Sequence, residues 1–183
     1  MAPRDYIIHP SAYDLGTVIA DIHEIRRFNK QRFEMEQLTA IVHEDEARGL
    51  CVGYKDVGTD EFWIRGHFPG MAVMPGVVMC EAAAQLSSYY TQKHALLGKD
   101  AHVVGFGGME EVRFREPVVP GDRLVIAVER VGPATRRDGV AVAHRGPVIT
   151  ARQRHVPAAA ERQGLGGVDA VVVATGHHAQ VVA

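Results

Sequence analysis

The stretch that most constrains this fold runs from residue 77 to about residue 97, has the composition of a long helix and is nearly all apolar in its first turns. Its opening residues, VVMCEAAA, include one charged side chain, that of Glu81. A helix that is apolar on most of its surface is stable in water only where other elements cover it on several sides. Gly98 follows as a residue type that commonly ends helices. The pattern therefore predicts a long central helix over about 77–97, enclosed by the rest of the chain.

Strand-like segments lie on both sides of this predicted helix. Residues 38–57, LTAIVHEDEARGLCVGYKDV, contain two β-type runs joined by a charged turn at 44–49, which indicates a hairpin. A second hairpin is predicted within 103–131, around the turn PGD at 120–122. Its strands alternate apolar with polar side chains, and the apolar members are Val112, Phe114, Leu124, Ile126 and Val128. We therefore predict an α+β fold, in which an antiparallel sheet covered on one face curls around the central helix.

Three further elements are predicted from local pattern alone. Residues 14–30 carry apolar side chains at helical spacing, with Asp14 as the N-cap, and indicate an N-terminal helix. Residues 139–150 indicate an edge strand, because Pro147 has no N–H to donate to a central ladder. The glycine-rich stretch 157–167 is typical of a linker.

The composition changes abruptly after residue 131. From Gly132 to Ala183 the chain contains no Phe, Tyr, Trp, Lys or Met, whereas Ala, Val, Arg, Gly and His dominate. We therefore divide the chain into a domain at 1–131 and a divergent segment at 132–183 that ends as a tail. Two explanations of the segment stay open, a natural but poorly ordered tail and a change of reading frame near residue 132.

Charge and composition exclude several functional classes. A net charge of −2 provides no basic surface of the kind that binds nucleic acid. The chain has no run of 18 apolar residues and no signal-peptide core, so we expect a cytoplasmic protein without membrane insertion. Its two cysteines, Cys51 and Cys80, suggest no disulfide framework and are expected to be buried apolar residues. HExxH, paired CxxC, Walker and GxGxxG patterns are absent from the sequence, so we expect neither a metal nor an organic cofactor.

The carboxylate of Glu81 stands out within the apolar helix. Glu81, Gln85, Ser88 and Gln92 share one helical stripe, so a solvated face is the simplest interpretation. The other sides of the first turns are apolar, which favours burial of most of this helix. A carboxyl that loses hydration holds its proton more firmly and can act as an acid near neutral pH. Glu81 is therefore a candidate proton donor.

His67 lies in the loop GHFPGMAVMPG that leads into the helix. A histidine in such a loop is often an ordinary surface residue. Here two Pro-Gly pairs make the loop stiff at its prolines and permissive at its glycines, so it can hold one imidazole in place. Gly76 opens the helix, where free N–H groups and the positive end of the helix dipole favour developing negative charge. A base, an acid and an oxyanion donor thus fall between residues 67 and 81.

These motifs resemble a known family. The segment GHFPGMAVMPGVVMCEAAAQ closely resembles the signature of the (3R)-hydroxyacyl-acyl-carrier-protein dehydratases of fatty-acid synthesis, and VRFREPVVPGDRL resembles the hairpin that follows it. Together the resemblance covers roughly residues 32–131. It implies a hot-dog fold, a sheet wrapped around a central helix, in a homodimer that in some members assembles further as a trimer of dimers. It also implies that each active site combines His and Glu from different subunits.

The resemblance also implies a hydro-lyase activity and a role for each matching residue. His67 matches the catalytic histidine, and Glu81 matches the acid of the elongation-type enzymes, whose glutamate favours plain dehydration. Gly76 matches the glycine whose N–H binds the thioester carbonyl, and the carbonyl of Val73 orients the histidine. Gln85 is placed to position the carboxyl.

The remaining predictions concern the substrate. Phe68, Met71 and Met74 are candidates to line an acyl chain, with ordinary packing as the alternative. The resemblance implies that the substrate is carried on the 4′-phosphopantetheine of acyl carrier protein, an acidic partner. Arg113 and Arg115, on one face of a predicted strand, are candidates to dock it, although their acidic neighbours also fit a mixed solvated surface.

Two departures from the family pattern leave alternatives open. A HRYPFLLVDR-like stretch is replaced here by QRFEMEQLTAIV, and the segment after residue 131 lacks the family's final long strands. A sheet edge left exposed in this way would favour aggregation. A hot-dog acyl thioesterase and a non-catalytic acyl-binding subunit therefore stay as alternatives to a dehydratase, since a fold alone does not decide an activity.

Overall fold

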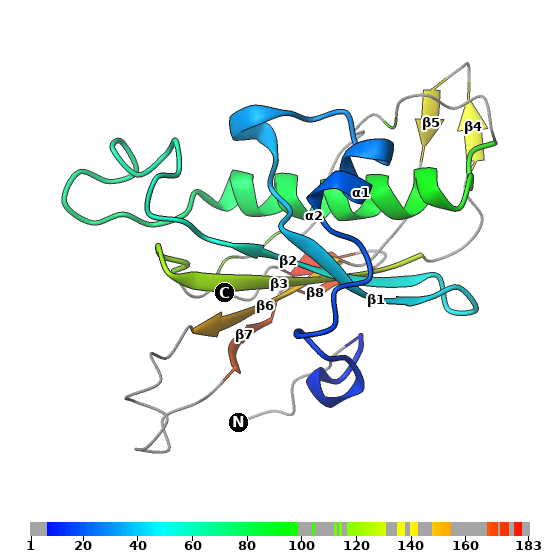
Figure 1. Ribbon diagram of the computed structural model, residues 1–183, viewed down its shortest axis with the longest axis horizontal. Helices are drawn as coiled ribbons and strands as arrows, with labels where there is room; N and C mark the ends of the chain where they lie inside the picture. The colour runs from blue at the N-terminus through cyan, green and yellow to red at the C-terminus, as the bar shows by residue number, and fades with distance from the viewer. Residues whose placement is uncertain are drawn as a thin grey trace.

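The computed structural model describes residues 7–98, residues 104, 112 and 114, residues 117–130, and the backbone of short strands beyond residue 130. Its dominant feature is one long helix, α2 (Gly76–Lys93), which lies across one face of an antiparallel sheet (Figure 1). The predicted α+β arrangement of a sheet packed on a central helix is confirmed.

The sheet contains five strands in the order β1-β2-β3-β6-β7, and each neighbouring pair is antiparallel. Their bounds are β1 (Ala40–Asp45), β2 (Leu50–Asp56), β3 (Asp122–Glu129), β6 (Val148–Arg154) and β7 (Val168–Val171). Two separate hairpins are formed by β4 (Thr135–Arg137) with β5 (Val140–Val142), and by β8 (Val173–Thr175) with β9 (His178–Gln180). The predicted first hairpin is confirmed, because β1 and β2 flank the charged turn.

The strand alternation decides which side chains meet the helix. Leu124, Ile126 and Val128 of β3 join the core beneath α2, as their spacing predicts. Gly53 of β2 allows the helix to approach closely, since a Cβ there would lie 3.1 Å from Leu86 Cδ1 and 3.0 Å from Ala40 O. The apolar core of the protein therefore sits between the helix and this face of the sheet.

The opposite face of the sheet is also buried, although the pattern predicted cover on one face only. Val52, Val125 and Ala127 point away from α2 and form a second apolar cluster with Ile8. Residues 7–15 cross beneath the sheet and supply this cover (Figure 1). The prediction was wrong because the intervening positions of β3 are apolar as well, so both faces exclude water.

The central helix ends four residues earlier than predicted, at Lys93. Ala95 adopts a left-handed conformation with φ 47°, Ala95 N–H donates to Gln92 O at 3.1 Å, and Leu96 N–H donates to Thr91 O at 3.0 Å. This pair of bonds is the Schellman arrangement that closes helix C-termini. The composition did not reveal it because Ala, rather than Gly, takes the left-handed position.

The N-terminal helix is much shorter than the predicted 14–30. Helix α1 spans Ile22–Phe28, and its N-cap is Asp21, whose Oδ1 accepts from Glu24 N–H at 2.9 Å. Asp14 instead closes a local turn, accepting from Gly16 N–H at 2.9 Å and from Thr17 Oγ1 at 2.7 Å. The backbone then extends so that Ala20 forms a bridge with Ile41, which prevents an earlier helix start.

Strand β6 shows that the divergent segment takes part in the sheet. It pairs with β3 along its length, from Val148 opposite Val128 to Arg154 opposite Asp122. It lies between β3 and β7, so the predicted edge position is wrong: Pro147 precedes the strand instead of interrupting it. The domain boundary at residue 131 stays a prediction, and the predicted linker 157–167 lies outside the described residues.

Candidate active site

The loop between β2 and α2 holds His67 by several bonds. Its backbone N–H donates to Trp63 O at 2.8 Å, and its carbonyl accepts from Val73 N–H at 2.9 Å. Its Nδ1 lies 2.7 Å from the carbonyl oxygen of Val73. A carbonyl oxygen can only accept, so Nδ1 carries the proton of this bond, and Nε2 of the neutral ring is left as an acceptor. The predicted contact with Val73 thus leaves a ring nitrogen available as a base.

The three residues predicted to line an acyl chain separate into two groups. Phe68 and Met71 are exposed, at 49% and 63%. The Phe68 ring stacks on the His67 ring with centroids 4.1 Å apart. Two backbone hydrogen bonds join Met71 to Phe68. Met74 is buried in the core beneath α2, and its N–H donates to Val118 O at 2.7 Å. For Met74 the structure therefore favours ordinary packing.

Glu81 lies one turn and a half into α2 and is half-buried. Gln85 Nε2 donates to Glu81 Oε1 at 2.7 Å, and Gln31 Nε2 lies 3.4 Å from the same oxygen. Gln85 and Ser88 are buried, so the helical stripe that contains Glu81 is not a solvated face. The structure brings together Glu81 and Gln85, as predicted, and adds Gln31.

The residues that hold Gln85 were missed by sequence reasoning. They belong to a segment at 31–37 that lies over the helix and includes the short 3-10 helix η2 (Phe33–Met35). Met35 O and Gln37 N–H both bond to the Gln85 amide. The one sequence feature that could have pointed to these residues is that their segment, QRFEMEQL, departs from the family pattern.

Gly76 is the first residue of α2, and it faces an aromatic ring. A Cβ at this position would lie 2.4 Å from Phe114 Cε2, so only glycine fits beside the ring as placed. Pro75 O accepts from Val78 N–H at 2.9 Å and from Met79 N–H at 3.2 Å. No hydrogen bond from Gly76 N–H occurs within the described part of the chain, which leaves this donor for a ligand.

His67 and Glu81 are not joined within one chain. No hydrogen bond or ion pair links these two side chains, both of which the structure describes. Arg113 and Arg115, predicted to dock a partner, lie outside the described residues. One chain thus prepares two half-sites, a histidine with the helix start and a braced carboxyl.

The cysteine next to the acid, Cys80, is less buried than predicted. Cys80 is half-buried, and burial raises its pKa to about 11, so the thiol stays protonated at neutral pH. Cys51 is fully buried in the core, as predicted, and burial raises the pKa of its thiol well above the usual value. Burial therefore favours the protonated thiol at both cysteines.

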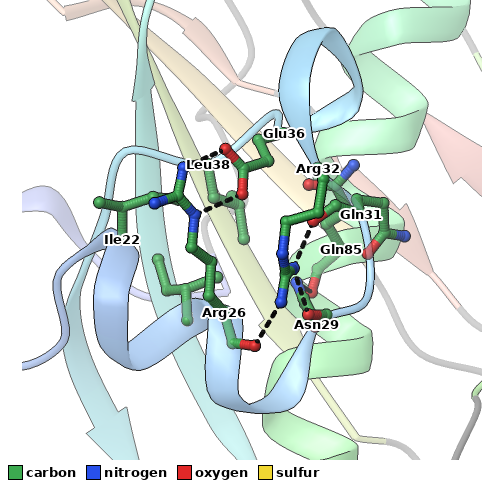
Figure 2. Close-up of a pocket in the computed structure, with 9 residues that line it drawn as sticks. Ile22, Arg26, Asn29, Gln31, Arg32, Glu36, Leu38 and Gln85 are labelled. Carbon is green, nitrogen blue, oxygen red and sulfur yellow. Dashed lines mark hydrogen bonds and ion pairs between the residues drawn. The ribbon is translucent and has the colours of Figure 1, made fainter.

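A small cavity lies beside Gln85 and is also lined by Asn29, Gln31 and Arg32, among others (Figure 2). Its volume is about 10 Å³, which is room for one water and not for an acyl chain. The Oδ1 atom of Asn29 is buried and has no partner among the described residues. Arg32 donates to the backbone oxygens of Asn29 and Arg26, so it ties the end of α1 to this wall.

The described residues show neither a metal-binding cluster nor a membrane-spanning helix. They contain no group of three or more His, Cys, Asp or Glu side chains placed to hold a metal ion. Among the described helices, none has the length and apolar character needed to cross a membrane.

The comparisons with known proteins identify the family. The model of the FabA-like domain matches residues 29–153. The 3-hydroxyacyl-(acyl-carrier-protein) dehydratase FabZ of Clostridium botulinum (strain Okra / Type B1) is 39% identical over 110 residues, which cover 60% of this chain and 74% of that protein. The enzyme of the same name from Hydrogenobaculum sp. (strain Y04AAS1) is 37% identical over 111 residues, covering 61% of this chain and 74% of that protein. The predicted hot-dog fold is thereby confirmed, and the chain belongs to the FabA-like family.

Proposed function

We propose that this protein removes water from a 3-hydroxyacyl thioester carried on acyl carrier protein, giving the trans-2-enoyl thioester of fatty-acid biosynthesis. The relatives named above are dehydratases of this substrate. The observation that carries the proposal is that the chain holds a histidine and a carboxyl each in a fixed orientation. His67 is fixed through Nδ1 by Val73, and Glu81 is fixed through one oxygen by Gln85.

The chemistry requires a base, an acid and a stabilising donor. Nε2 of His67 takes the proton from the carbon next to the thioester carbonyl. The Gly76 N–H, with the positive end of the α2 dipole, stabilises the charge that develops on the carbonyl oxygen. Glu81 gives a proton to the hydroxyl group, the carbon–oxygen bond breaks, and water leaves as the carbon–carbon double bond forms. The proton on His67 then returns to the carboxylate of Glu81 through solvent.

The complete site is proposed to form between two copies of the chain, with His67 from one and Glu81 from the other. Large apolar side chains remain exposed around both half-sites, including Phe33 at 85%, Val77 at 75% and Met71 at 63%. Exposed apolar side chains gathered in this way mark an interaction surface. A homodimer would bury them and would close an acyl pocket, and three such dimers could assemble further as a trimer of dimers.

The remaining expectations are proposals of the same kind. No metal or organic cofactor takes part, since the three steps are proton transfers between groups of this chain and the substrate. The carrier protein docks near the entrance of the site. A cytoplasmic location, predicted from the sequence, stays a prediction.

Substitution of the acid and the base tests the activity. His67→Ala and Glu81→Gln should each lower kcat by about 10²–10⁴-fold, the usual contribution of general acid–base catalysis. The measurement is absorbance at the enoyl-thioester band with 3-hydroxyacyl and crotonyl thioesters. His23→Ala, which removes an exposed imidazole from α1, serves as the control and should behave as wild type.

Two outcomes would contradict the proposal. Release of free thiol without formation of the enoyl product would identify a thioesterase. Absence of turnover in the wild-type protein, with acyl binding that neither substitution changes, would identify a binding subunit.

A further inference from the structure

The orientation of the Gln85 amide is decided by two backbone groups. Its Nε2 donates to Met35 O at 2.6 Å, and its Oε1 accepts from Gln37 N–H at 2.9 Å. A carbonyl only accepts and an N–H only donates, so rotating the amide by 180° would break both bonds. Asn29 Nδ2 also donates to the backbone oxygen of Gln85 at 2.9 Å. Gln85 therefore presents an N–H, and never its oxygen, to Glu81.

This orientation makes the two oxygens of Glu81 unequal. Oε1 faces the Gln85 N–H at 2.7 Å, so a proton on Oε1 would meet a donor that cannot accept it. Gln31 Nε2 lies on the same side, at 3.4 Å from Oε1. No hydrogen bond within the described residues reaches Oε2. A proton on this carboxyl therefore sits on Oε2, the oxygen that no described donor holds.

Gln31 and the groups that hold Gln85 come from one segment. Met35 and Gln37 follow Gln31 within QRFEMEQL, the stretch that departs from the family pattern. Arg32 anchors this segment by donating to the carbonyls of Asn29 and Arg26 at 2.9 and 3.0 Å (Figure 2). Residues 31–37 thus brace Gln85, the helix residue that holds the acid.

We propose that Gln31 is a positioning residue which acts with Gln85 to reserve Glu81 Oε1 as an acceptor, so that Oε2 delivers the proton in dehydration. In that step the Oε2–H bond breaks, the proton forms the second O–H bond of the departing water, and Glu81 is left as a carboxylate held by two amide donors. The inference rests on the proposed function.

Two substitutions of Gln31 separate hydrogen bonding from shape. Gln31→Leu removes the donor, and kcat should fall about 3–10-fold, the equivalent of one hydrogen bond, with KM changed less than twofold. Gln31→Glu keeps the shape and places a second carboxylate beside Glu81. Its kcat at pH 7 should fall below that of Gln31→Leu, and the alkaline limb of its kcat–pH profile should move to higher pH, because like charges disfavour ionisation.

An infrared measurement tests the same contact without turnover. The C=O stretch of the protonated Glu81 carboxyl, assigned as the band lost in Glu81→Gln, should move to higher wavenumber in Gln31→Leu, because Oε1 loses a donor. Gln92→Leu and Gln92→Glu, at a half-buried position farther along α2, provide matched controls and should change neither the band nor kcat.

The outcomes distinguish this inference from the proposed function. Wild-type kcat, pH profile and carboxyl band in both Gln31 variants would overturn the role of Gln31 while leaving the dehydratase activity intact. A tolerated Gln31→Glu with a damaged Gln31→Leu would also overturn it, since shape alone would then matter. Full activity in His67→Ala and Glu81→Gln would instead refute the proposed function, and the infrared band would still report on the contact.

Discussion

At the scale of single residues, His67 and Glu81 are each held by a group that can take only one hydrogen-bonding role. The Val73 carbonyl accepts from His67 Nδ1, and the oriented Gln85 amide donates to Glu81. Such partners determine which ring nitrogen is basic and which carboxyl oxygen carries the proton. The sequence predicted His67, Glu81, Val73 and Gln85 from their resemblance to a family signature. Gln31 escaped prediction because its contact depends on how distant segments pack.

Gly76→Ala tests whether the helix start needs a residue without a side chain beside the Phe114 ring. The added Cβ would lie 2.4 Å from Phe114 Cε2, so the ring must move. We expect about a 10-fold loss in kcat/KM, below the loss that follows removal of a whole oxyanion donor, because the N–H remains. In a Phe114→Ala background the same substitution should cost far less, and equal losses in both backgrounds would show that the ring is not the cause.

At the scale of elements, α2 combines two tasks, since its buried side chains build the core and its first turns carry Gly76 and Glu81. Its start was predicted almost to the residue, because Pro75 and the apolar run are local signals. Its end was not, because Ala95 closes the helix in a conformation that its residue type disfavours. The early start predicted for α1 was wrong for a different reason. The backbone near Ala20 forms hydrogen bonds with β1 and is therefore not available for helical hydrogen bonds.

Ala95→Gly should stabilise the protein. The left-handed conformation costs a non-glycine residue about 1–2 kcal/mol, and the added freedom of glycine in the unfolded chain offsets about 0.4–1 kcal/mol of that gain. We expect a net increase of about 0.5–1 kcal/mol in the free energy of unfolding, measured by urea denaturation.

Ala84→Gly is the matched control for this substitution. It places the same residue inside α2 and should destabilise the protein by about 1 kcal/mol. A loss of stability in both variants would mean that Ala95 is not strained.

At the scale of the whole molecule, the sheet holds α2 on one face and the N-terminal residues on the other (Figure 1). β6 extends the sheet beyond β3, so the compositional change after residue 131 does not end it. Apolar side chains near the half-sites, including Phe33 and Val77, are exposed in the single chain. Because a dimer would bury them, the dimer is the proposed functional unit.

Mixing two inactive variants tests that assembly. In a dimer formed from one His67→Ala chain and one Glu81→Gln chain, one site loses both groups and the other keeps both. Random exchange by co-refolding equal amounts should restore about a quarter of wild-type activity, because half of the dimers are mixed and each has one intact site. If His67 and Glu81 of one chain worked together, the mixture would stay inactive.

By itself the sequence determined the central helix, the antiparallel hairpin before it and the residue types of the site, because periodicity and short motifs act over a few neighbouring positions. The tertiary structure decided where α1 begins, which strand borders β3, and which donors face Glu81. Those outcomes depend on backbone groups and side chains far apart in the chain, such as Gln31 with Glu81 and Ala20 with Ile41. No local pattern carries that information, because the competing hydrogen bonds exist only once the chain has packed.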